Sequence, residues 1–368
     1  MGACITGDGI IDREKEHPER EDFHLIGTEF LDGQGLGNQL FVYVTARSIA
    51  EERGCAFGTA GQECFANNIH SRRGMYFMDI DLGVEITPEM AAGMNRFDDE
   101  DTRIFLGNSR HDLTHGCFIS GAKASIHEVP DNTLLYGNLQ DESYFAFCRD
   151  KLREWLPVKP EYDSAEYTAD DLCIINMRGG EYAGDPALCL DRRYWVSAIR
   201  KMKKINPAMR FMIVTEDEAT AHRILPEYEA HHFDMGKDYV TIRNARYLIL
   251  SNSSFAVLPA MTSTELQYAI APKYWARHNV SDGYWASEQN IYGFLHYLGR
   301  DDREYTAEEC RAELEVYKAH SALYARRGIR PTGAALALEQ AKCRGRIVGF
   351  YGVRVFRSFR RRVRELAK

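Results

Sequence analysis

The feature that most constrains this chain is an alternation of short apolar runs with a helical pattern, beginning near residue 172. Apolar runs of strand length lie at residues 172–177 and 211–215, and shorter ones follow at 248–250 and 268–271. The segment between the first two runs repeats bulky residues at helical spacing: Tyr194, Trp195, Ala198, Ile199 and Met202. Because strand–helix–strand units close with right-handed crossovers, this pattern predicts a parallel sheet in an α/β fold.

A second α/β unit is predicted ahead of the first. A strand expected at residues 25–31 leads into a glycine-rich turn at residues 31–38, and the helix that follows can end at Gly54. Residues 133–136 read as a strand, and residues 143–155 read as a helix. Further helices are predicted at residues 240–248 and 307–326.

Length and turn signals divide the chain into four parts. Two prolines in Leu156–Asp163 mark a linker, and 368 residues are enough for two domains. We therefore expect α/β domains at residues 23–157 and 158–330, after a charged, flexible arm at residues 1–22 and before a basic tail at residues 331–368.

Composition places the chain among soluble enzymes, with 45% hydrophobic and 27% charged residues. The sequence has no apolar run near the roughly 18 residues that a membrane-spanning helix needs. Nine cysteines without a Cys-x-x-Cys pair indicate neither a zinc knuckle nor a disulfide framework, which favours a reducing cytoplasm.

Three segments are suited to an anion. Glycines of the Gly33–Asn38 turn allow a ligand close to the backbone at a helix start. Arg178 follows a predicted parallel strand, where ligands of α/β sheets bind, and Ser251–Phe255 follows another. Taken singly, each has a structural alternative: a tight packing turn, an arginine paired with Glu181 or Asp185, and a plain helix cap.

Together these segments resemble motifs of the glycosyltransferase family 11 fucosyltransferases, in the family's order. Gly-Leu-Gly-Asn-Gln-Leu-Phe-x-Tyr at residues 35–43 resembles its N-terminal signature. Met177-Arg178-x-Gly180-x-Tyr182 resembles its His-x-Arg-Arg-Gly-Asp-Tyr motif, and Leu250–Phe255 resembles its Ala-Asn-Ser-Ser-Phe motif.

The resemblance implies a GT-B fold, in which two Rossmann-like domains face a central cleft. It also implies inverting, metal-independent transfer of L-fucose from GDP-fucose to a glycan hydroxyl, with no cofactor. By position, it makes Arg178 the catalytic residue that holds the donor diphosphate. The donor-binding residues it implies are Gly35, Gly37, Asn38, Asn176, Asp217, Ser253, Ser254 and Phe255.

The chain departs from the family motif at three positions. Asn176 replaces its histidine, Gly179 its second arginine and Glu181 its aspartate. Two alternatives therefore stand beside fucose transfer: the same scaffold with another nucleotide sugar, and a degenerate protein that only binds a glycan or a partner.

A metal site is not expected. Asp79-Ile80-Asp81 is an Asp-x-Asp motif and residues 98–101 are an acidic cluster, but such groups arise by chance among 54 acidic residues. Arg72 and Arg73 could meet an acidic acceptor glycan, although a solvated loop is the simpler interpretation.

The C-terminal tail is strongly basic. Residues 342–368 carry ten Lys or Arg and one Glu, whereas the whole chain has a net charge of −8. Spacing of the tail predicts a basic amphipathic helix that binds an anionic membrane surface. Such a tail would fit a cytoplasmic enzyme that is peripheral on the inner face of the membrane. There the enzyme would act on lipid-linked glycans of bacterial surface polysaccharide. Nucleic-acid binding, which we do not expect, and packing on the acidic body are the alternatives.

Overall fold

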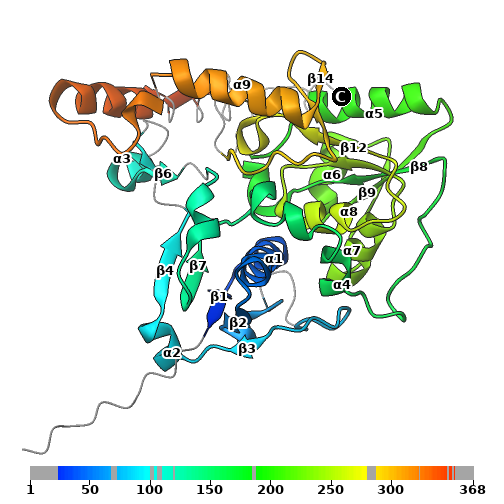
Figure 1. Cartoon of the computed structure of the whole chain (residues 1–368). Helices are drawn as coiled ribbons and strands as arrows, with labels where there is room; N and C mark the ends of the chain where they lie inside the picture. The colour runs from blue at the N-terminus through cyan, green and yellow to red at the C-terminus, as the bar shows by residue number, and fades with distance from the viewer. Residues whose placement is uncertain are drawn as a thin grey trace, which may run out of the picture.

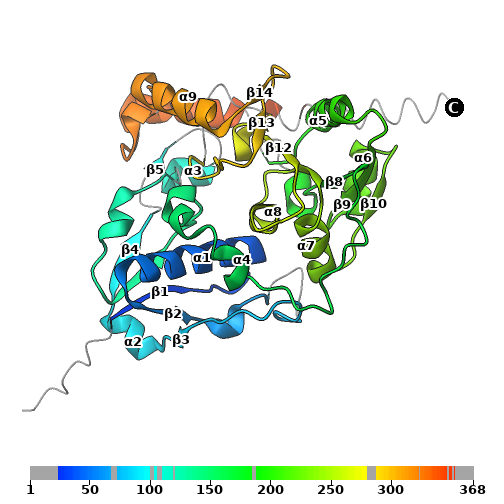
Figure 2. The ribbon, with the colours of Figure 1, turned by 45° about the vertical axis from the view of Figure 1, so that its right-hand side comes forward.

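The computed structural model describes residues 24–67, 73–99, 103–105, 110–118, 121–184, 188–279, 287–322, 324–345, 348, 349 and 352. Two parallel sheets with flanking helices form separate lobes, with helices α1 and α8 between them (Figures 1 and 2). The predicted α/β class with two Rossmann-like domains is confirmed. The arm at residues 1–22 and the tail beyond residue 352 lie outside the described residues, while residues 333–345 are helical.

The N-terminal sheet has the strand order β3-β2-β1-β7-β4, with parallel pairing throughout. Helix α1 (Leu36–Arg53) joins its two central strands and ends at Gly54, whose φ of 66° is left-handed, as predicted. Its strands are β1 (Leu25–Glu29), β2 (Ala56–Ala60), β3 (Val84–Glu85), β4 (Asn95–Asp98) and β7 (Thr133–Tyr136). Between β3 and β7 the chain also forms α2 (Pro88–Gly93), β5 (Arg103–Ile104), α3 (Arg110–His115) and β6 (Cys117–Phe118).

The C-terminal sheet has the strand order β10-β9-β8-β11-β12-β13-β14, and only its last pair is antiparallel. The chain runs outward from β8 to one edge and then returns to β11 on the other side of β8. In such sheets a ligand binds at the carboxyl ends of the strands where the order reverses. The strands are β8 (Leu172–Asn176), β9 (Arg210–Val214), β10 (Glu229–His231), β11 (Tyr247–Leu250), β12 (Tyr268–Pro272), β13 (His296–Leu298) and β14 (Glu304–Tyr305).

Four helices of the C-terminal domain, α5, α6, α7 and α9, begin at side-chain caps. Asp191, Asp217, Asp234 and Thr306 each accept a backbone N–H of the helix they precede. The helices are α5 (Arg192–Ile205), α6 (Glu218–Ile224), α7 (Met235–Arg243), α8 (Val257–Met261) and α9 (Ala307–His320).

Three predicted helices were wrong in extent. Residues 143–155 form η3 (Glu142–Tyr144), η4 (Ala146–Cys148) and α4 (Leu152–Trp155), because Phe145, with φ of −142° and ψ of 0°, leaves the helical conformation between the first two turns. Helix α7 starts at Met235, since its cap is Asp234, and β11 occupies part of the range 240–248. Helix α9 stops at His320, with a separate turn η8 at Tyr324–Arg326.

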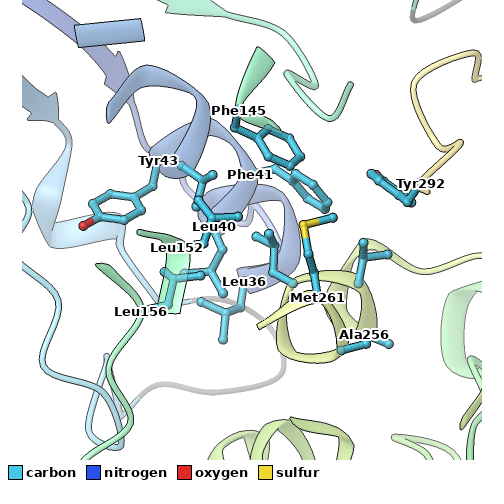
Figure 3. Packing of buried hydrophobic residues seen from close by; sticks show 14 of the residues in the cluster. Leu36, Leu40, Phe41, Tyr43, Phe145, Leu152, Leu156, Ala256, Met261 and Tyr292 are labelled. Atoms are coloured by element: carbon cyan, nitrogen blue, oxygen red, sulfur yellow. The ribbon is translucent and has the colours of Figure 1, made fainter. Parts of the chain in front are cut away.

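One apolar cluster joins the two domains. Helix α1 contributes Leu36, Leu40 and Phe41, and Met261 of α8 lies against them (Figure 3). The Phe41 ring stacks on Tyr292 with centroids 5.9 Å apart. This packing places the start of α1 against the turn η6 (Ser254–Ala256).

Candidate functional site

A cavity of about 340 Å³ lies where the two domains meet. Its wall combines the glycine-rich turn before α1 with the residues that follow β8, β9, β10 and β11. It therefore includes the point where the strand order of the C-terminal sheet reverses. All predicted site residues except Asp217 line it: Gly35, Gly37, Asn38, Asn176, Arg178, Ser253, Ser254 and Phe255.

The start of α1 offers hydrogen-bond donors to this cavity. The first turn of the helix contains no acidic residue, and Gly35 precedes it with extended backbone angles. Within the described part of the chain, the N–H groups of Leu36 and Gly37 have no hydrogen-bond partner. Such N–H groups and the helix dipole together favour an anion.

Arg178 places a positive charge at the cavity. Its side chain is 19% exposed, and its guanidinium lies 2.9 Å from a carboxylate oxygen of Glu181 and 3.2 Å from one of Glu216. The Tyr182 ring lies 5.3 Å from the guanidinium carbon. Arg178 therefore faces the cavity while it is paired with two carboxylates. Pairing with Glu181 was one sequence alternative; Asp185 lies outside the described residues.

The serine turn links the domains. Ser254 Oγ donates to Asn38 Oδ1 at 2.6 Å, and Gln140 Nε2 donates to the same oxygen at 3.0 Å. Ser253 accepts the Phe255 N–H, so it does act as a cap. Asn176 is buried and accepts a hydrogen bond from Ser251, which connects the ends of β8 and β11.

Asp217 is not among the residues that line the cavity. Its carboxylate accepts the N–H groups of Thr220 and Gly180, each at 2.9 Å. Hydrogen bonding by the Thr220 side chain, helped by the two backbone N–H groups, holds the pKa of Asp217 below its usual value. Asp217 thus caps α6 and fixes the turn after Arg178, while its neighbour Glu216 faces the cavity.

Sequence reasoning missed a histidine–carboxylate pair on the cavity wall. His232 Nδ1 lies 3.2 Å from Asp238 Oδ2, and both residues line the cavity. Burial raises the pKa of Asp238 to about 7, although the neighbouring His232 opposes this shift. His232 follows β10, a strand of three residues that is too short to recognise from sequence. The one local signal available was Asp234, which caps the start of α7.

Among the acidic residues considered for a metal, Asp79, Asp81, Asp98 and Asp99 do not line the cavity, and residues 100 and 101 lie outside the described part of the chain. Asp81 accepts the Gly83 N–H, and Asp98 pairs with Arg96 at 3.0 Å. Within the described residues, no group of three His, Cys, Asp or Glu side chains is arranged to hold a metal ion. No described helix is both long and apolar enough to span a bilayer.

No protein-family model matches the sequence, and no curated protein is similar to it. Among solved structures, the fold is similar to the fucosyltransferase NodZ from Bradyrhizobium, with 11% identity over 66% of this chain and 94% of that chain and a TM-score of 0.37. POFUT1 in complex with GDP has 10% identity over 68% and 98%, with a TM-score of 0.38. A glycosyl transferase family 9 protein from Veillonella parvula has 12% identity over 83% and 98%, with a TM-score of 0.38. At these low values no substrate or mechanism is carried over from them.

Proposed function

We propose that this protein is a metal-independent, inverting glycosyltransferase whose cavity binds the diphosphate of a nucleotide sugar. The observation that carries the proposal is the convergence of Arg178, the serine turn after β11 and two N–H groups at the start of α1 that have no partner among the described residues. These groups come from three distant parts of the chain. They meet at the carboxyl ends of the strands where the order of the C-terminal sheet reverses, which is where an α/β sheet binds its ligand.

The mechanism follows from charge. During glycosyl transfer the leaving nucleoside diphosphate gains negative charge while the anomeric carbon becomes oxocarbenium-like. Arg178 and the N–H groups of Leu36 and Gly37 would stabilise that charge in place of a metal ion. Loss of one such group typically costs on the order of 10²–10³ in rate.

The donor we propose is GDP-fucose, on the resemblance to the family 11 motifs, and the acceptor is a hydroxyl of a glycan bound mainly by the N-terminal domain. A cytoplasmic enzyme of surface-polysaccharide synthesis, held at the inner face of the membrane by residues 342–368, fits the basic tail. Co-sedimentation with anionic vesicles tests the tail, and unchanged sedimentation after its deletion would exclude this role.

A screen of donor hydrolysis across GDP-, UDP- and dTDP-sugars tests the activity. Arg178→Ala should abolish turnover while leaving the melting temperature within a few degrees of wild type. Near-normal turnover by that variant would overturn the proposal. A preference for another nucleotide would favour the second candidate, the same scaffold with a different donor.

A catalytically degenerate binding protein is the remaining candidate, and one observation favours it. Arg178 is already paired with two carboxylates, and the family's second arginine is Gly179. This candidate predicts that no nucleotide raises the melting temperature, whereas the proposed transferase should be stabilised by its own donor nucleotide.

A further inference from the structure

The two carboxylates on Arg178 are held in different ways. Glu216 is 16% exposed in its side chain, and the oxygen that contacts Arg178 also accepts the Gly179 N–H at 2.9 Å. A carboxylate that is bonded to both the guanidinium and the following turn fixes the orientation of the arginine. Glu216 is therefore a positioning residue.

Glu181 is held by much less. Its side chain is 53% exposed, and Arg178 is its only hydrogen-bond or ion-pair partner among the residues that the structure describes. Partly exposed ion pairs of this kind contribute little stability, because water solvates both charges well. The Glu181 carboxylate can therefore leave Arg178 at small cost, whereas Glu216 cannot.

The net charge of Arg178 and its two partners also matters. Arg178 carries one positive charge, and Glu181 and Glu216 carry two negative charges, so the trio is net negative. If both carboxylates stayed on Arg178, they would repel an approaching phosphate while the guanidinium attracted it. Removal of Glu181 from the guanidinium takes away the negative charge that lies nearest to it, at 2.9 Å, and so favours the approach of a phosphate.

We propose that the Glu181 carboxylate occupies the place on Arg178 that the donor diphosphate takes, and that donor and carboxylate exchange there in each cycle. The inference rests on the proposed function, because it assumes that a diphosphate binds at Arg178. A weakly bound monoanion gains too little to displace Glu181, whereas a diphosphate presents several charges. When the nucleoside diphosphate leaves, the return of Glu181 to Arg178 promotes product release.

The test is titration calorimetry of wild type, Glu181→Gln and Glu227→Gln with inorganic pyrophosphate and with GDP. Glutamine keeps the size of the side chain and removes its charge, so Glu181→Gln should bind both ligands about three- to tenfold more tightly. Glu227 forms a similar partly exposed pair with Arg192 and does not line the cavity. Its variant should therefore bind both ligands within twofold of wild type.

Arg178→Ala separates this inference from the proposed function. If wild type binds pyrophosphate and Arg178→Ala does not, the proposal of a diphosphate site at Arg178 is supported. If Glu181→Gln then binds pyrophosphate no more tightly than wild type, only the proposed exchange with Glu181 is overturned. If no variant, including Glu181→Gln, binds pyrophosphate or GDP, both proposals fall. A GDP dissociation rate that is slower in Glu181→Gln than in wild type supports the role in product release, and an equal rate contradicts it.

Discussion

A methyl group added at Gly37 would strike backbone on the opposite domain. A Cβ built there lies 2.4 Å from the Phe255 nitrogen, 2.5 Å from the Ser254 carbonyl carbon and 2.6 Å from the Phe255 Cα. Because all three atoms belong to the main chain, no rotamer change relieves the overlap. To restore ordinary contact, α1 and η6 would have to separate by about 1 Å.

The size of the effect follows from two opposing contributions. Alanine inside a helix is favoured over glycine by about 0.5–1 kcal/mol. Overpacking of this kind costs about 1–3 kcal/mol, so the difference predicts that Gly37→Ala lowers the free energy of unfolding by up to about 2.5 kcal/mol, with a middle value of about 1 kcal/mol. The same separation stretches the 2.6 Å contact of Ser254 with Asn38 beyond hydrogen-bond distance. A displacement of about 1 Å in a reacting site can cost on the order of 10²-fold in rate.

Urea unfolding measures the first effect, and donor hydrolysis with pyrophosphate titration measures the second. Gly93→Ala is the control, because Gly93 is also helical, has nothing within 4 Å of an added Cβ and lies away from the cavity. It should leave stability equal or slightly higher and activity unchanged. If Gly37→Ala is as stable as wild type and binds and reacts within twofold, the close approach of α1 to η6 is refuted.

Three further results are expected. Asp217→Ala removes the α6 cap and should lower the free energy of unfolding by about 1–2 kcal/mol in urea; an unchanged midpoint would show that the cap is dispensable. Burial raises the pKa of Asp238 to about 7. Between about pH 4 and 7 the folded chain therefore holds a proton on Asp238 that the unfolded chain releases. The contribution of Asp238 to the free energy of unfolding falls as the pH rises through this range. Unfolding at pH 4.5, 5.5 and 7 should therefore show a shallower decline for Asp238→Asn than for wild type, and parallel declines would contradict the shift. EDTA should leave donor hydrolysis unchanged, and a loss of activity that Mn²⁺ restores would require a metal ion instead of Arg178 alone.

The parts of the site that could be predicted are those attached to clear secondary-structure signals. Apolar runs fixed β8 and β11 closely enough to place Arg178 and the serine turn at their carboxyl ends. The glycine-rich turn and Gly54 marked both ends of α1. The meeting of Arg178 with the serine turn could be anticipated because β8 and β11 belong to one parallel sheet, whose strands share their carboxyl edge. The glycine-rich turn follows β1 of the other sheet, so only the resemblance to a GT-B fold indicated that it would face them.

Residues that escaped prediction depend on finer geometry. Glu216 and Asp217 are adjacent acids, and the sequence does not tell which one faces the cavity. The choice is made by the start of α6, which needs Asp217 as its cap and so turns Glu216 toward Arg178. His232 and Asp238 follow a strand of three residues, and their contact forms only when α7 packs beside it.

The apolar packing of α1 on α8 limits how the two lobes can move. If the lobes parted widely, water would reach the buried side chains of Leu36, Phe41 and Met261. Exposure of apolar surface costs about 25 cal/mol for each Å². Wide separation of the lobes is therefore unfavourable, and the contact between α1 and α8 favours relative motions small enough to keep this cluster away from water.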